Sequence, residues 1–88
     1  MSEIENNNNP TTIEVNSIML LQNVGNYKDA FKACKNLFIK YPNSPLLYNI
    51  LGAINVGKCD FTNAIYSYLY AIKIKPNYAQ AFNNLGIL

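Results

Sequence analysis

Large and small apolar residues recur at helical spacing along most of the chain, and polar turns separate the segments that carry them. In the segment 45–56, Tyr48, Leu51 and Gly52 lie at positions that share one face of a helix. After the polar turn, a second stripe steps by three, four and three residues: Phe61, Ala64, Tyr68 and Ala71. The pattern predicts two antiparallel helices, in which the aromatic rings of one pack over the small residues of the other.

Capping signals predict where these helices begin. Thr11 and Glu14 fit a capping box at the start of a first helix. Ser44 followed by Pro45 is a start signal, because Ser caps free amides and Pro is tolerated at the first helical position. Asn26 and Asp60 are the candidate caps of two further helices. The predicted helices are Thr11–Gln22, Tyr27–Lys40, Pro45–Val56, Phe61–Lys73 and a last one within Tyr78–Leu88.

The whole pattern repeats at one fixed offset. Displacing the sequence by 34 residues aligns Pro42 with Pro76 (76 − 42 = 34) and Gly52 with Gly86. Further aligned pairs are Tyr27 with Phe61, Ala30 with Ala64, Tyr48 with Phe82 and Leu51 with Leu85. Self-similarity at such a period is the signature of a stacked helical array, and ~34 residues is the tetratricopeptide length.

The sequence resembles the tetratricopeptide repeat (TPR) family over residues 11–88. The family's order of aromatic, Leu-Gly, aromatic, alanine and proline positions is matched by Tyr48, Leu51, Gly52, Phe61, Ala64, Tyr68, Ala71 and Pro76. Residues 79–86 match the opening of a further repeat. The resemblance implies an all-α fold, a TPR-type α-α solenoid that is a right-handed superhelix of antiparallel helix pairs.

The resemblance also divides the chain. We expect residues 1–10 to be a disordered, Asn-rich leader, because the segment has little to bury. The array at 11–88 is then divided into a degenerate repeat 1 at 11–44, repeat 2 at 45–78 and the first helix of a truncated repeat 3 at 79–88. Repeat 1 is degenerate because Glu14, Ser17 and Ile18 stand where the family has a ring, a leucine and a small residue. Since about three repeats are needed for a stable solenoid, we expect the N-terminal part of a longer array.

Composition and charge argue against several classes of function. All seven basic residues are lysines, dispersed along residues 11–88, which carry a net charge of +4 against three carboxylates. Without arginine, which forms bidentate contacts with guanine and phosphate, nucleic-acid binding is disfavoured. No hydrophobic run approaches the ~20 residues of a membrane span, and the acidic start is unlike a signal peptide, so we expect a cytoplasmic protein without membrane contact.

Catalytic and metal chemistry are also disfavoured. Histidine is absent, and Cys34 and Cys59 have no metal-ligand spacing, so we expect no metal site, no cofactor and no enzymatic activity of this chain alone. Asp29 and Asp60 lie beside helix starts, where a carboxylate caps free amides. Cys34 aligns with Tyr68 on the inner side of a second helix, which predicts a buried free thiol.

The TPR resemblance implies a concave groove that is lined by the first helix of each repeat and holds a peptide or a partner segment. The groove residues that it implies here are Val15, Met19, Leu46, Asn49, Ala53, Val56, Gln80, Asn83 and Ile87, with Thr12 and Gln22 at the ends of the first helix. The amides of Asn49 and Asn83 suit the main chain of a peptide, since each has donors and an acceptor. The alternative is that they form a solvated polar face.

The favoured function is a protein-protein interaction scaffold. The alternative is the N-terminal TPR region of a larger enzyme (a glycosyltransferase, sulfotransferase or methyltransferase), where the array recruits or positions substrate. A third possibility is a self-assembling scaffold, because Phe82 and Leu85 leave an apolar edge that needs a cover. The partners expected are therefore a protein or peptide, or a C-terminal continuation of the same chain.

Overall fold

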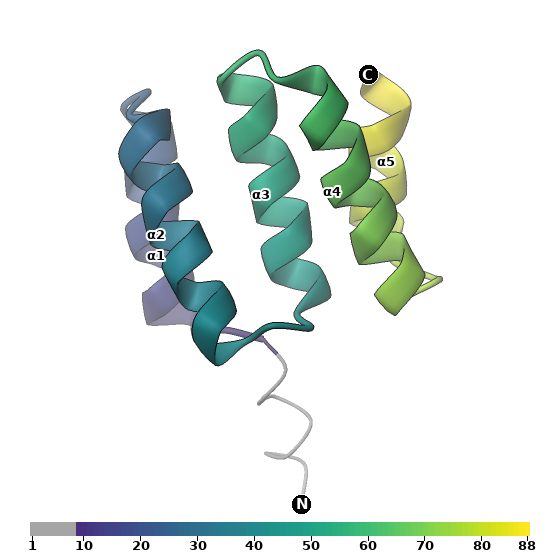
Figure 1. Ribbon diagram of the computed structural model, residues 1–88, viewed down its shortest axis with the longest axis horizontal. Coiled ribbons are helices and arrows are strands. Elements are labelled where there is room, and N and C mark those ends of the chain that lie inside the picture. The colour runs from purple at the N-terminus through teal and green to yellow at the C-terminus, as the bar shows by residue number, and fades with distance from the viewer. Residues whose placement is uncertain (1–8) are drawn as a thin grey trace, which may run out of the picture.

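The structure is a computed structural model that describes residues 9–88, and these residues form five α-helices with no strand among them. Figure 1 shows the helices, which are α1 (Thr12–Asn23), α2 (Tyr27–Lys40), α3 (Pro45–Gly57), α4 (Phe61–Ile74) and α5 (Ala79–Ile87). Each helix lies within one or two residues of its predicted bounds. The all-α, TPR-type helical repeat fold predicted from the sequence is confirmed.

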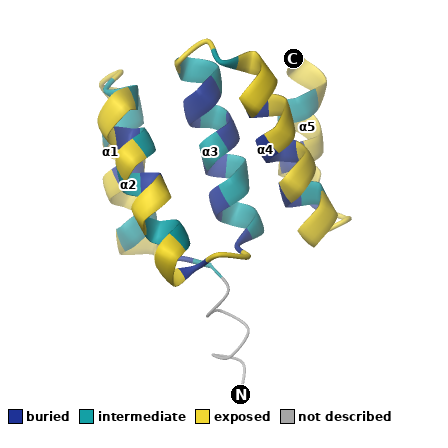
Figure 2. Ribbon diagram, viewed as in Figure 1, coloured by how far each residue is buried: buried dark blue, intermediate teal, exposed yellow. Residues whose placement is uncertain are grey.

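Consecutive helices pack against one another, and α3 lies at the centre of the arrangement. In Figure 1, α2 and α4 lie in front, and α1 and α5 lie behind them. The helix α3 contacts α2, α4 and also α5, the next first helix of the array. Figure 2 shows the consequence, because buried and half-buried residues cover most of α3 while exposed residues cover the outer sides of the other helices.

The predicted caps hold the helix starts. The Thr11 hydroxyl accepts from the Glu14 amide at 3.2 Å, and the Glu14 carboxylate accepts from the Thr11 amide at 2.9 Å, which completes the capping box. Ser44 accepts from the Leu47 amide at 3.0 Å, ahead of Pro45 at the first turn of α3. Asn26 and Asp60 cap α2 and α4 in the same way.

Rings packed on glycines set the spacing of the helices. A Cβ atom at Gly52 would overlap the Tyr68 ring, so α3 and α4 approach as closely as they do only because this side chain is absent. Ala64 is fully buried beside them. A second contact of this kind was not predicted, because Gly57 was assigned to the turn. It is the last residue of α3, and the Tyr27 ring of α2 packs directly on it.

The structure describes only the last two residues of the predicted leader. Residues 1–8 of the predicted leader lie outside the described residues, but Asn9 and Pro10 are described. Pro10 is buried, and the Asn9 side chain accepts a hydrogen bond from Ser44, so these two residues belong to the packed part of the chain. Val24, which directly follows α1, is 77% exposed.

The two turns between paired helices have the same geometry although their residues differ. Gly25 has φ 77°, in the left-handed region, and Cys59, which lies one repeat later, has φ 61°. Gly25 and Cys59 also donate to equivalent carbonyls, those of Gln22 and Val56. A residue with a Cβ pays roughly 1–2 kcal/mol for this conformation, so the second turn is strained where the first is not.

The substitution Gly52→Ala should destabilise the fold by about 1–3 kcal/mol, since the new methyl group forces the Tyr68 ring away. Gly86→Ala is the matched control, because Gly86 occupies the same repeat position and a Cβ there meets nothing within 4 Å. The control should be neutral or stabilising by up to about 1 kcal/mol. Urea denaturation of both variants measures the difference, and equal effects would contradict the packing.

The substitution Cys59→Gly should stabilise the protein by up to about 1 kcal/mol, because glycine adopts the left-handed conformation without strain. The reciprocal change, Gly25→Ala, should destabilise it by a similar amount. Both free energies of unfolding come from chemical denaturation under reducing conditions. A Cys59→Gly variant less stable than the original chain would show that the turn is not strained.

Candidate functional site

The residues predicted to line the groove lie on α1, α3 and α5, and we call the surface that they form the first-helix face. On α3, Leu46, Asn49, Ala53 and Val56 are all half-buried. On α5, Gln80, Asn83 and Ile87 are exposed. On α1, Val15 is half-buried and Met19 is 42% exposed, while Thr12 is exposed and Gln22 is half-buried. The side chains on α3 are thus partly covered by their neighbours, and those on α5 are open.

Some of these residues also belong to the fold itself. Val15 and Leu46 pack against the buried cluster that joins α1, α2 and α3. The Asn49 side-chain oxygen accepts from the Asn84 amide at 3.0 Å, which links α3 to α5. Burial raises the pKa of Tyr78, and a hydrogen bond with Asn49 acts in the opposite direction. Asn49 therefore connects two first helices, in addition to the role in binding expected from the sequence.

The partner of Asn49 was not among the predicted groove residues. The sequence favoured Asn83, which lies one repeat from Asn49, but Asn83 is exposed and it is Asn84 that turns toward α3. Asn49 and Asn84 are 35 residues apart in the sequence, which is one residue more than the repeat length. A search for polar residues at the repeat offset and one position beyond it would have found this pair.

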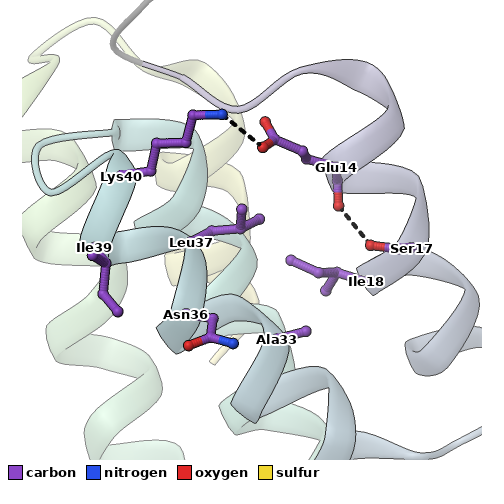
Figure 3. Close-up of a pocket in the computed structure, with 8 residues that line it drawn as sticks. All are labelled: Glu14, Ser17, Ile18, Ala33, Asn36, Leu37, Ile39 and Lys40. Atoms are coloured by element: carbon purple, nitrogen blue, oxygen red, sulfur yellow. Dashed lines mark hydrogen bonds and ion pairs between the residues drawn. The ribbon is translucent and has the colours of Figure 1, made fainter.

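The hollows of the surface lie elsewhere, since none of the predicted groove residues lines the three described here. The first hollow has a volume of about 430 Å³ and lies between α1 and α2 (Figure 3). Its lining is Glu14, Ser17, Ile18, Ala33, Asn36, Leu37, Ile39 and Lys40. Glu14 and Ser17 stand where the repeat pattern has a ring and a leucine, and these smaller, polar side chains leave the space open.

Glu14 holds the two helices together across this hollow. Its carboxylate accepts from the Tyr41 hydroxyl at 2.8 Å and forms an ion pair with Lys40 at 3.4 Å, the contact drawn in Figure 3. These contacts come in addition to the Thr11 amide of the capping box. The Thr11 bond, with the Tyr41 hydroxyl next, lowers the pKa of Glu14 from 4.5 to about 2. Glu14, Lys40 and Tyr41 therefore form a polar cluster that attaches α1 to the end of α2.

Two smaller hollows lie on the other side of α3, where α2 and α4 flank it. The second has a volume of about 270 Å³ and the third about 290 Å³. They adjoin, since Lys35, Tyr48 and Leu51 line both. The Tyr48 ring stacks on Tyr70 with the centroids 5.2 Å apart. This surface is aromatic, and its use is considered below.

We next consider the side chains that could bind a metal ion or act as a nucleophile. Residues 9–88 contain no group of three or more His, Cys, Asp or Glu side chains that could hold a metal ion. The prediction of a buried free thiol at Cys34 is confirmed. Its sulfur donates to the Leu47 carbonyl at 3.8 Å, and burial raises the pKa of the thiol to about 12. Cys34 is therefore protonated at neutral pH and a poor nucleophile.

None of the helices in the described residues is both long enough and apolar enough to cross a bilayer. The cytoplasmic location expected from the sequence stays a prediction.

Comparisons with known proteins agree with the helical repeat. The family model described as TPR repeat matches residues 60–88. Photosystem I assembly protein Ycf3 of Dioscorea elephantipes is 36% identical to this chain over 76 residues, and the protein of the same name from Sorghum bicolor is equally similar. The match covers 82% of this chain and 44% of each relative, so the chain spans less than half the length of these curated relatives. No solved structure matches.

The attachment of α1 should depend on pH through Glu14. Because its pKa in the fold lies below 4.5, the stabilisation is complete above that value and is lost as the pH falls toward about 2. We expect Glu14→Gln to lower the melting temperature at pH 7 and to melt close to the original chain near pH 2. Thermal melts of the two proteins across this range measure the effect. A difference that stays constant with pH would show that the charge of Glu14 does not act.

Proposed function

Because the chain is a tetratricopeptide repeat protein, we propose that it is a protein-interaction module that holds a segment of a partner protein against the first-helix face. The proposal extends the general role of such repeats to a particular surface. It also specifies a non-enzymatic role, in which binding rather than chemistry is the activity.

The observation that carries the proposal is the composition and burial of the first-helix face on α3. Leu46 and Val56 are half-buried apolar side chains, and Ala53 between them is small and half-buried. Asn49 is held in place by Asn84, so its amide loses little conformational freedom when a partner binds. A fixed amide between apolar side chains suits a peptide, whose main chain needs donors and acceptors and whose side chains need apolar contacts.

The relatives support an assembly role. Both are named as photosystem I assembly proteins. A repeat module that binds segments of partners without acting on them is suited to such a task. We propose the same kind of role for this chain, with partners of its own, since the match covers 44% of each relative.

The test begins with a library of random peptides displayed on phage, from which binders to the whole chain are selected. Affinities of the selected peptides are then measured for Ala53→Glu, which places a charge in the middle of the first-helix face. Thr62→Glu is the matched control, because it adds the same charge at an exposed position on α4. We expect Ala53→Glu to weaken binding by ~10-fold or more, and the control to change it less than about 2-fold.

Circular dichroism confirms that both variants are folded before their affinities are compared. Peptides that bind Ala53→Glu as well as the original chain would contradict the proposal. So would peptides whose binding is lost only in variants of α2 and α4.

A further inference from the structure

The second and third hollows form a surface on the side of α3 that faces away from the first-helix face. Tyr48, Leu51 and Asn55 line the hollows, whereas Leu46 and Ala53 belong to the first-helix face. At about 100° per residue these two sets lie roughly opposite each other around α3. The walls come from α2 and α4, and the lining of the second hollow is Phe31, Lys35, Tyr48, Leu51, Asn55, Lys58, Asp60, Asn63, Tyr66, Ser67 and Tyr70. We call the second hollow, together with the adjoining third, the aromatic hollow.

Two ammonium groups lie near the Phe31 ring in the lining of the aromatic hollow. Lys58 lies 3.8 Å and Lys35 lies 5.6 Å from the centre of the Phe31 ring. A ring face attracts a cation but takes none of its hydrogen-bond donors. The ion pair found in the described residues joins Lys40 to Glu14, so neither of these lysines has a carboxylate within 4.0 Å. Both can therefore bind an anion.

The one carboxylate that lines the hollow is already engaged. Asp60 accepts from the backbone amide of Asn63 at 3.3 Å and from its side-chain amide at 2.8 Å. These bonds hold it at the start of α4 and lower its pKa. With two lysines against this single carboxylate, the hollow keeps a net positive charge.

A largely buried amide contributes to the lining of the hollow. Asn55 is 3% exposed and lines the hollow. Its backbone carbonyl accepts from the Asp60 amide at 2.8 Å. The side-chain amide has donors and an acceptor, so it can bond the main chain of a ligand in the hollow.

We infer that the aromatic hollow binds an acidic peptide segment of a partner protein, as a second docking site on the face opposite the first-helix face. A Glu or Asp carboxylate of the segment lies between Lys35 and Lys58, and the Asn55 amide bonds its main chain. An aromatic side chain of the segment packs beside the stacked rings of Tyr48 and Tyr70. A volume of about 270 Å³ with the adjoining 290 Å³ accommodates a short extended segment.

The probe is a blocked peptide of the sequence Glu-Glu-Tyr-Glu-Glu, titrated into the isotope-labelled chain, with Gln-Gln-Tyr-Gln-Gln as its uncharged counterpart. We expect the side-chain amide signal of Asn55 and the backbone signals of 55–60 to shift with the acidic peptide and not with the uncharged one. Binding should weaken as salt rises, since the contacts are ionic. Shifts confined to α1 and α5 would overturn the inference, as would an absence of binding.

Matched variants separate the site from general attraction between opposite charges. The double variant Lys35→Gln with Lys58→Gln should weaken binding by ~10-fold, on the order of two ion pairs. Lys28→Gln with Lys32→Gln removes the same charge from exposed positions of α2 outside the hollow, and should weaken it less than about 2-fold. Equal losses in the two double variants would refute a specific site.

A further variant tests the floor of the hollow. Asn55→Leu removes the buried amide at similar volume, so it should weaken binding while the chain remains at least as stable toward urea. A variant that binds normally would show that the amide contacts no ligand. A clear loss of stability would show that the amide serves the fold. None of these results bears on the first-helix face, so they test this inference separately from the proposed function.

Discussion

Contact between an aromatic ring and a glycine backbone is the constraint on which the rest of the arrangement depends. Tyr68 rests on Gly52, and Tyr27 rests on Gly57, so the two glycines of α3 receive rings from the helices on either side of it. A ring that meets backbone directly brings two helix axes closer than a ring that meets a side chain. The distance between neighbouring helices determines how much of α3 stays accessible, and hence the form of both of its surfaces.

The helices and their starts could be predicted because they depend on local chemistry. A capping residue acts within three positions, as Thr11 and Glu14 do, and the apolar spacing acts within one helix. The ring over Gly52 could be predicted too, since the repeat pattern pairs a large residue with a small one. The ring over Gly57 could not, because glycine at a helix end is as compatible with a turn as with a close contact.

The two proposed binding surfaces were less predictable, because they depend on which side chains lie next to each other across helices. The first-helix face was predicted from the family resemblance, but the bond between Asn49 and Asn84 needed the relative position of α3 and α5. The aromatic hollow combines residues of α2, α3 and α4 whose roles look ordinary when each helix is taken alone. Lys58 in particular follows α3 in a polar turn, where a lysine usually means only contact with solvent.

The first and last helices, α1 and α5, contact their neighbours without a ring packed on a glycine. At α1, polar groups take its place, since the Glu14 carboxylate contacts Tyr41 and Lys40 instead of a ring filling the space. Such contacts depend on charge, whereas the ring on Gly52 depends only on shape. On α5, Gly86 is the glycine at the repeat position of Gly52. No ring packs on it, because a Cβ atom at Gly86 would meet no atom of another helix within 4 Å. Asn84 supplies the tie to α3 instead.

The two proposals together give the central helix a different partner on each of its two sides. On α3, Gly52 and Ile54 are buried, whereas Asn49 and Ala53 on one side and Tyr48 and Leu51 on the other are half-buried. The side with Asn49 and Ala53 is weakly polar and carries no charge, so it selects by shape and main-chain bonds. The side with Asn55 and Lys58 is aromatic and positive, so it selects by charge. Because the ring contacts hold α3 closely against α2 and α4, and the two surfaces share no residue, the partner proposed for one side need not displace the partner proposed for the other.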